Sequence, residues 1–223
     1  MRNLTLIIPA KKEKESLSKV LDELEPYNFK VVIVLEKEDL ETIETIRNKS
    51  CKILYQKNKG YGDALIQGIN YIEDEFFCIF NADGSFDPSE INNMIQILHK
   101  NNADFVFASR YEKNCSSEDD TLVTKIGNFI FTKIGNIFFN LHISDILYTF
   151  VVGKTQKVKN LNLKSKDFVF CVELPIKANR NNFRLVTSKS NERSRIGGVK
   201  KPNAFKDGFK ILFGMIKLFF KIF

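Results

Sequence analysis

The chain has 223 residues, a mass of 25.8 kDa, 43% hydrophobic residues and 27% charged residues. These values exclude a disordered or collagen-like protein and fit one large domain with at most a short appendage. The formal net charge of +7 favours an anionic partner, such as a phosphorylated small molecule, a nucleic acid or a membrane surface. The four cysteines form no CxxC pair, so we expect a reducing compartment and no zinc site.

Short apolar runs alternate with helical patterns in the first half of the chain. The predicted strands are 4–9, 31–35, 52–55, 76–80 and 103–109, and the predicted helices are 16–24, 40–47, 62–72 and 88–100. Apolar strands joined by helices are typical of a mostly parallel α/β sheet with helices on both sides. Because ligands of such sheets bind at the carboxyl ends of the strands, we expect functional residues directly after the strands.

The second half of the chain is less regular. We predict an acidic, exposed and mobile loop over 112–121, a helix over 125–141 and a returning apolar strand over 145–153. A helix over 167–178 and a strand over 184–188 precede a basic segment at 193–201. These patterns divide the chain into one domain over 1–202 and a C-terminal amphipathic helix over 203–223.

The segment Asn-Ala-Asp-Gly-Ser at 81–85 follows the predicted strand 76–80 directly. The carboxylate of Asp83 is therefore expected at the ligand side of the sheet, where it could bind Mg²⁺ or Mn²⁺ and leave coordination positions open for a diphosphate. The alternative is a turn that begins the next helix, because Asp-Gly and Asp-Pro are turn formers.

Three other segments could contact a ligand in the same way. After the first strand, Lys11 and Glu13 lie where a nucleotide could bind, or they belong to a solvated helix start. Gly60 and Gly62 open a helix and could let backbone N–H groups approach an anion, although the spacing is not that of a Walker loop. Arg110 follows another strand and could hold a phosphate, or it is a surface arginine.

The order and spacing of these segments resemble the family-two glycosyltransferases, and within them the dolichyl-phosphate mannosyltransferase-like branch. The resemblance covers about residues 4 to 210. The residues that match the family's successive motifs are Pro9 with Glu13, Lys59 to Ala64, Asn81 to Gly84 in place of the Asp-x-Asp motif, Ala108 to Tyr111, Ser144 with Asp145, and Arg193 with Gly197 and Lys200.

This resemblance implies a GT-A fold, the Rossmann-like fold of nucleotide-diphospho-sugar transferases, and inverting transfer from a GDP- or UDP-sugar. Asp83, with Asn81, would hold Mg²⁺ or Mn²⁺. The donor would contact Pro9, Ala10, Glu13, Glu36, Lys59, Gly60, Asn81, Ala82, Asp83, Arg193 and Lys200.

The resemblance also implies a polyprenyl phosphate as the acceptor, with a dolichyl or undecaprenyl chain. Such an acceptor brings an anionic oxygen, and Arg110, Arg193 and Lys200 would position it. A sugar or small-molecule hydroxyl would instead need a carboxylate base, for which Asp145 is the first candidate and Glu173 the second.

Two departures from the family pattern leave alternatives open. Asn81 replaces the first carboxylate of the Asp-x-Asp motif and is a neutral, poorer metal ligand. Glu36 stands where the family has an aspartate that contacts the base or ribose, so the nucleotide base stays open. The substitution at Asn81 also keeps a different class of protein in view, namely a nucleotide-sugar-binding subunit of a membrane assembly with little catalysis.

The last predicted helix has a basic stripe of Lys206, Lys210, Lys217 and Lys221 beside a broad apolar face. This pattern predicts an interfacial helix on an anionic membrane, and thus a cytoplasmic protein bound peripherally to the inner membrane face. The alternatives are a helix packed on the domain or a homo-oligomer contact. We expect no nucleic-acid partner, because the positive charge concentrates at the C-terminus without a recognition motif. The helix 125–141 is expected in the core or along an acyl path, and the loop 112–121 could close over the acceptor.

Overall fold

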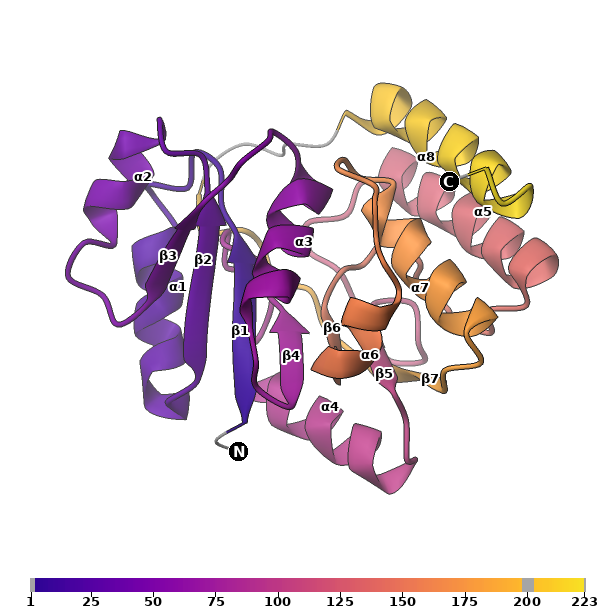
Figure 1. Ribbon diagram of the computed structural model, residues 1–223, viewed down its shortest axis with the longest axis horizontal. Coiled ribbons are helices and arrows are strands. Elements are labelled where there is room, and N and C mark those ends of the chain that lie inside the picture. Colours follow the sequence, from indigo (N-terminus) through magenta and orange to yellow (C-terminus); the bar gives the residue numbers. More distant parts are fainter. Residues whose placement is uncertain (1–2, 198–202, 223) are drawn as a thin grey trace.

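The computed structural model describes residues 3–197 and 203–222. One seven-stranded sheet has the order β3-β2-β1-β4-β6-β5-β7 (Figure 1). The strands are β1 (Leu4–Pro9), β2 (Lys30–Leu35), β3 (Lys52–Tyr55), β4 (Phe76–Ile79), β5 (Phe105–Ser109), β6 (Val151–Lys154) and β7 (Leu185–Lys189). All neighbours pair in parallel except β6, which is antiparallel to both β4 and β5.

The antiparallel strand β6 lies between β4 and β5 near the centre of the sheet. Its register places Gly153 between Phe77 and Phe105. A Cβ at this position would come within 2.8 Å of the Phe77 ring and even closer to the Phe105 ring, so glycine is required there. The strand predicted over 145–153 pairs only from Val151, and the residues before it form no ladder.

Helices cover both faces of the sheet, as predicted. On one face, α1 (Leu17–Leu24) and α4 (Ser89–Lys100) pack against side chains such as Leu6 and Ile8. On the other face, α3 (Tyr61–Tyr71), α6 (Thr155–Asn160) and α7 (Phe170–Arg180) pack against Ile7 and Phe77. The alternation of Leu6, Ile7 and Ile8 between two apolar clusters explains why β1 shows no polar alternation. The first half of the chain also contains the short α2 (Leu40–Thr45) and the 3-10 turn Glu25–Tyr27.

Two further helices, α5 (Leu122–Phe139) and α8 (Ala204–Phe219), lie side by side beyond α7 (Figure 1). The helix α5 begins three residues earlier than predicted, because the Thr121 hydroxyl accepts a hydrogen bond from the Thr124 N–H and caps it. One face of α8 is buried through Ile211, Met215 and Leu218 against α5 and α7. No helix within the described ranges combines the length and apolarity needed to cross a membrane.

Candidate active site

The candidate site lies where the carboxyl ends of the parallel strands meet, as the sequence predicts. Because β6 runs in the opposite direction, the residues that lead into it reach the same edge of the sheet. A cavity of about 960 Å³ opens there. Its polar part is lined by Pro9, Ala10, Lys11, Glu13, Glu36, Gln56, Gly60, Asn81, Ala82, Asp83, Ser85, Arg110, Asp119, Thr149, Glu192 and Arg195.

The segment after β4 forms a tight turn on the floor of this cavity. Asp83 Oδ1 accepts hydrogen bonds from the Ser85 N–H at 3.0 Å and the Ser85 hydroxyl at 2.7 Å. Gly84 has a φ of +83°, a left-handed conformation that favours glycine. The Asn81 amide donates to the Ser85 hydroxyl at 3.3 Å. Asp83 Oδ1 therefore holds the turn, as the turn-forming alternative predicts, while the residue also lines the cavity.

The turn offers few oxygen donors to a divalent metal ion. Asp83 offers Oδ2, which lies 3.8 Å from Arg195 Nη2, while its Oδ1 already accepts two hydrogen bonds. Within 3–197 and 203–222, no group of three or more His, Cys, Asp or Glu residues could hold a metal ion. Mg²⁺ is commonly held by one or two carboxylates together with substrate phosphates and water. The turn therefore supplies few protein donors, and a metal ion here would depend on further ligands from a bound diphosphate.

The loops after β1 and β2 form one wall of the cavity. Lys11 Nζ lies 2.8 Å from Glu36 Oε1, so the two residues form an ion pair at the rim. Glu13 is buried, and its carboxylate accepts a hydrogen bond from the Ser16 hydroxyl at 3.0 Å. At the start of α3, Gly60 has a φ of +131°, and a Cβ there would overlap the Lys166 carbonyl. This wall therefore joins residues from β1, β2 and α3, as the resemblance implied.

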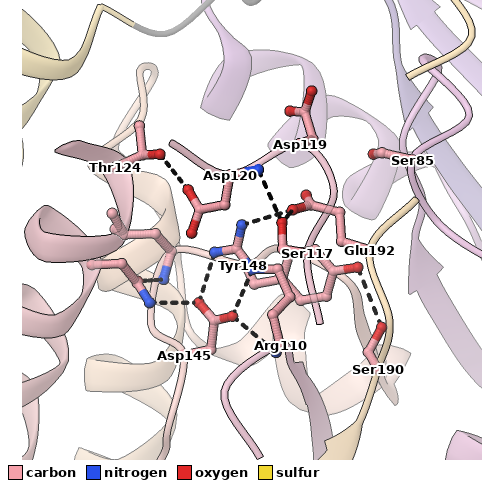
Figure 2. Close-up of polar contacts among 12 residues, drawn as sticks. Ser85, Arg110, Ser117, Asp119, Asp120, Thr124, Asp145, Tyr148, Ser190 and Glu192 are labelled. Carbon is pink, nitrogen blue, oxygen red and sulfur yellow. Dashed lines mark hydrogen bonds and ion pairs between the residues drawn. The ribbon is translucent and has the colours of Figure 1, made fainter. Parts of the chain in front are cut away.

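Arg110 and Asp145 form a buried ion pair at the back of the cavity (Figure 2). Asp145 Oδ2 accepts from Arg110 Nε at 2.8 Å, and Oδ1 accepts from Arg110 Nη2 at 3.0 Å. Asn128 of α5 also donates to Asp145 Oδ1 at 2.8 Å. The guanidinium lies over the ring of Tyr148, 4.5 Å from its centroid. Asp145 does not line the cavity, and both of its carboxylate oxygens accept hydrogen bonds from protein groups.

Glu192, after β7, is the second carboxylate on Arg110. Its Oε2 lies 3.1 Å from Arg110 Nη1 and also accepts a hydrogen bond from the Ser117 hydroxyl. Burial raises the pKa of Glu192, although Arg110 and Ser117 oppose this effect by favouring the ionised form. Arg110 is therefore a buried cation between two carboxylates, and not the surface arginine of the alternative interpretation.

The predicted donor residue Arg193 and its neighbour Arg195, which was not predicted, lie in different surroundings. Arg193 does not line the cavity; it is paired with Glu23, and its Nη2 donates to the Gly84 carbonyl at 3.0 Å. Arg195 lines the cavity instead and forms a bidentate contact with Asp119, at 2.9 and 2.8 Å. Two overlapping Gly-x-x-Lys patterns, at 197–200 and 198–201, left the sequence without a way to choose between the two arginines.

The three remaining predicted residues are Lys59, Glu173 and Lys200. Lys59 is exposed and does not line the cavity. Glu173 is fully buried in α7, where it accepts hydrogen bonds from the Lys164 and Ser165 N–H groups. It caps a loop and does not line the cavity, so the structure removes it as a candidate base. Lys200 lies outside the described residues.

The acidic loop expected to be mobile is tied to the segment after β7. Glu192 N donates to the Ser116 carbonyl and Glu118 N donates to the Glu192 carbonyl, each at 3.0 Å. The Glu118 carboxylate accepts from the Ser194 N–H at 3.1 Å. Asp119 thereby lines the cavity, where its carboxylate accepts hydrogen bonds from Arg195. Sequence reasoning missed Asp119 and Arg195, because no local motif marks a contact between segments 76 residues apart.

The cavity continues from this polar part into an apolar part between α5 and α8. The apolar part is lined by Val123, Ile126, Ile130, Phe131 and Ile134 of α5, by Phe205, Phe209, Ile211 and Leu212 of α8, and by Leu147, Phe168 and Cys171. A single cavity therefore joins the Asp83 turn to an opening between two helices. The helix α5 is thus partly in the core, because Phe139 is buried, while Ile126 and Ile130 are about half exposed and line the cavity; the acyl path stays a prediction.

The chain matches a family model described as glycosyl transferase family 2 over residues 5–161. This match spans more than half of the sequence, and the chain belongs to that family. A solved structure of glucosyl-3-phosphoglycerate synthase from Mycobacterium tuberculosis, in complex with Mn²⁺, UDP and glucosyl-3-phosphoglycerate, superposes with a TM-score of 0.77 at 10% identity. It covers 97% of this chain and 80% of that one, so the fold is GT-A, as predicted.

Curated relatives are similar over most of this chain. The UDP-N-acetylglucosamine–dolichyl-phosphate N-acetylglucosaminyltransferase of Methanococcus voltae is 23% identical over 96% of this chain and 95% of its own length. The dolichol-phosphate mannosyltransferase of Pyrococcus furiosus is 26% identical over 78% of this chain but only 52% of its own length. Another solved structure of the M. tuberculosis synthase contains Mg²⁺ and UDP, with a TM-score of 0.73, 11% identity, and coverage of 97% of this chain and 79% of that one.

Proposed function

We propose that this chain transfers a sugar from a nucleotide-diphosphate sugar to a polyprenyl phosphate at a membrane surface. The observation that carries the proposal is the single cavity of about 960 Å³, which runs from the Asp83 turn to the apolar opening between α5 and α8. A polar ligand and an apolar chain could therefore occupy the two ends of one site. The names of the two curated relatives agree with this division, since both specify a dolichyl-type phosphate.

The reaction at the polar end is a displacement at the anomeric carbon. An acceptor phosphate oxygen forms the new bond to this carbon from the face opposite the leaving group, which inverts the configuration. The bond to the donor's β-phosphate oxygen breaks, and the nucleoside diphosphate leaves with the electron pair. A divalent cation held by Asp83, with Asn81 beside it, would neutralise charge on this leaving group. Glu36, Lys11 and Gly60 line the wall that would receive the nucleoside.

The hydrogen bonding of the carboxylates favours a phosphate over a hydroxyl acceptor. A hydroxyl must give up its proton to a base, whereas a phosphate oxygen is already anionic. Asp145 accepts hydrogen bonds from both Arg110 and Asn128, and Glu192 accepts from Arg110 and Ser117. Both carboxylates are therefore engaged by hydrogen-bond donors of the protein itself, and Asp145 does not line the cavity. We assign Arg110 and Asp145 as positioning residues that shape the acceptor end of the cavity.

An exposed apolar surface on α5 and α8, which includes some of the side chains that line the cavity, supports peripheral membrane binding. Its exposed large side chains are Leu122, Val123, Ile126, Phe129, Ile130, Ile137 and Phe138 of α5, with Phe205, Phe209, Leu212, Phe213, Ile216 and Phe219 of α8. The exposed Lys206, Lys210 and Lys217 of α8 would face anionic headgroups, which favours the cytoplasmic leaflet. Because α8 also packs on α5 and α7, it would bind the membrane as part of the domain.

A transfer assay tests this proposal. Purified protein is incubated with radiolabelled UDP-GlcNAc, UDP-glucose or GDP-mannose and a polyprenyl phosphate in detergent, and the label extracted into organic solvent is counted. We expect label in the lipid fraction with at least one donor, and none when free polyprenol replaces its phosphate. Equal transfer to polyprenol or to a soluble sugar would contradict the lipid-phosphate acceptor. Donor binding without any transfer would instead indicate a nucleotide-sugar-binding subunit.

A further inference from the structure

A cation of the protein itself occupies the neighbourhood of the Asp83 carboxylate. Arg195 Nη2 lies 3.8 Å from Asp83 Oδ2, and both residues line the cavity. Arg195 reaches this position from the segment after β7, whereas Asp83 follows β4. The two segments also share a backbone hydrogen bond, because Ile196 N donates to the Asp83 carbonyl at 2.8 Å. The guanidinium is therefore held next to the turn on which a diphosphate would bind.

The same turn lacks one of the negative charges that would attract a metal ion. Position 81 is an asparagine whose amide donates to the Ser85 hydroxyl, and Asp83 is the one carboxylate of the segment 81–85. A divalent cation at Asp83 would therefore meet a single carboxylate from this turn and, at short range, a guanidinium of the same sign, while the nearby Asp119 carboxylate already accepts hydrogen bonds from that guanidinium. Both features lower the affinity for the metal, since like charges repel most strongly where water is partly excluded.

Arg195 is held in a fixed orientation and still has hydrogen-bonding capacity. Its Nε and Nη2 donate to the two oxygens of Asp119, at 2.9 and 2.8 Å. Within the described ranges, Nη1 has no hydrogen-bond partner. The loop that holds Asp119 is itself paired with the segment after β7 through Ser117 and Glu192. An arginine held by a carboxylate on one edge of its planar fork can bind a phosphate with the other edge.

We propose that Arg195 binds the donor's diphosphate and provides much of the positive charge that a divalent cation would otherwise provide at this turn. The inference rests on the proposed function, because it assumes a nucleotide diphosphate in the cavity. It assigns Arg195 as a donor-binding residue and makes nucleotide-diphosphate binding largely independent of Mg²⁺ or Mn²⁺. The opposing interpretation is that Arg195 only joins the loop to the domain, while a metal at Asp83 is required for the diphosphate.

Binding measurements without catalysis separate these interpretations. Titration calorimetry with UDP and with GDP is done in EDTA and in Mn²⁺ on the full chain. We expect the better nucleotide to bind in EDTA within about tenfold of its affinity in Mn²⁺. Arg195→Gln should weaken binding in EDTA by about 10- to 100-fold, with Arg195→Lys between the two, because a charge-assisted hydrogen bond is lost. Asn81→Asp should increase the effect of Mn²⁺ on affinity.

Two controls make the result specific to the diphosphate. Arg184→Gln removes one positive charge from an exposed position next to the amino end of β7 and should leave affinity unchanged. Uridine and guanosine lack phosphates, so their weak binding should not respond to Arg195→Gln. Thermal unfolding of each variant without ligand shows whether the fold is retained, and Arg195→Lys keeps the test valid if Arg195→Gln unfolds.

The outcomes distinguish the inference from the function on which it rests. Binding that needs Mn²⁺ and is equal in Arg195→Gln and Arg184→Gln would overturn the inference and leave the transferase proposal standing. Failure of both nucleotides to bind in either condition would overturn the two together. Binding in EDTA that depends on Arg195 and on the presence of phosphates supports the inference.

Discussion

The guanidinium of Arg110 and the carboxylate of Asp145 meet in a two-point contact, with Nε–Oδ2 at 2.8 Å and Nη2–Oδ1 at 3.0 Å. The sequence suggested independent roles for them, a phosphate ligand and a proton acceptor. The Asp145 side chain has 0% exposure and that of Arg110 has 10%, so neither charge is free to act alone. Together the two residues join β5 to α5 and to the segment before β6.

Loss of one partner of this buried pair should cost stability. We expect Asp145→Ala to lower the free energy of unfolding by about 3–5 kcal/mol, because Arg110 then keeps a buried charge with fewer partners. Urea unfolding followed by circular dichroism measures the change. Glu41→Ala removes a carboxylate from an exposed ion pair with Lys14 and should cost less than about 1 kcal/mol. Equal effects in the two variants would contradict a special role for the buried pair.

The raised pKa of Glu192 predicts a pH dependence of stability. Burial makes the folded protein bind a proton at Glu192 at pH values where the unfolded chain has released it. The contribution of Glu192 to stability is therefore largest below its unfolded pKa and is lost as the pH rises through its folded pKa. Glu192→Gln lacks this titration, so its stability relative to the parent chain should increase between about pH 4 and pH 7. A constant difference across this range in urea unfolding would show that the pKa is not raised.

Two glycines of α8 offer a matched test of how this helix packs. A Cβ at Gly214 would overlap the Val169 side chain, whereas a Cβ at Gly208 would be 4.0 Å from the nearest atom, on Phe131. Alanine favours a helix over glycine by about 1 kcal/mol. We therefore expect Gly208→Ala to raise the melting temperature and Gly214→Ala to lower it. A rise in both variants would mean that α8 does not pack on Val169.

The exposed apolar surface predicts binding to vesicles. Phe209 and Phe213 are 73% and 59% exposed, so replacing them with serine should affect folding little. Since burying a phenylalanine contributes about 1.5–3 kcal/mol, each replacement should weaken binding to vesicles of phosphatidylglycerol and phosphatidylcholine about tenfold or more. Co-sedimentation measures this, with Leu40→Ser of α2 as the control. Unchanged vesicle binding, together with loss of a dimer in both phenylalanine variants, would favour the homo-oligomer alternative.

Much of the fold could be predicted from the sequence, because the strands in the first half are apolar throughout and separated by helical periodicity. The five strands predicted before residue 110 are all present. The position of β6 could not be predicted, because its pairing with β4 and β5 joins segments about 45 to 75 residues apart and follows no local rule. The start of α5 was missed because the capping threonine lies within a polar run.

The candidate site was predictable where a motif follows a strand, and not where distant segments meet. The turn with Asp83 and the loops with Glu13 and Glu36 line the cavity as expected. Their roles toward donor and metal stay predictions. Arg195 and Asp119 were missed because their pairing depends on the bridge between the acidic loop and the segment after β7. Hydrophobic periodicity contains no information about such a contact.

The placement of β6 has a consequence for how the chain folds as it is synthesised. Strand β4 is buried throughout, and β6 hydrogen-bonds to its side opposite β1. Until residue 154 has left the ribosome, that side is an apolar edge with unpaired backbone groups, which is a site for aggregation. Strand β5 likewise pairs only with β6 and β7, which come later in the sequence. The two parts of the sheet are therefore joined only when β6 inserts between β4 and β5, and a nascent chain that stalls before β6 should depend on chaperones.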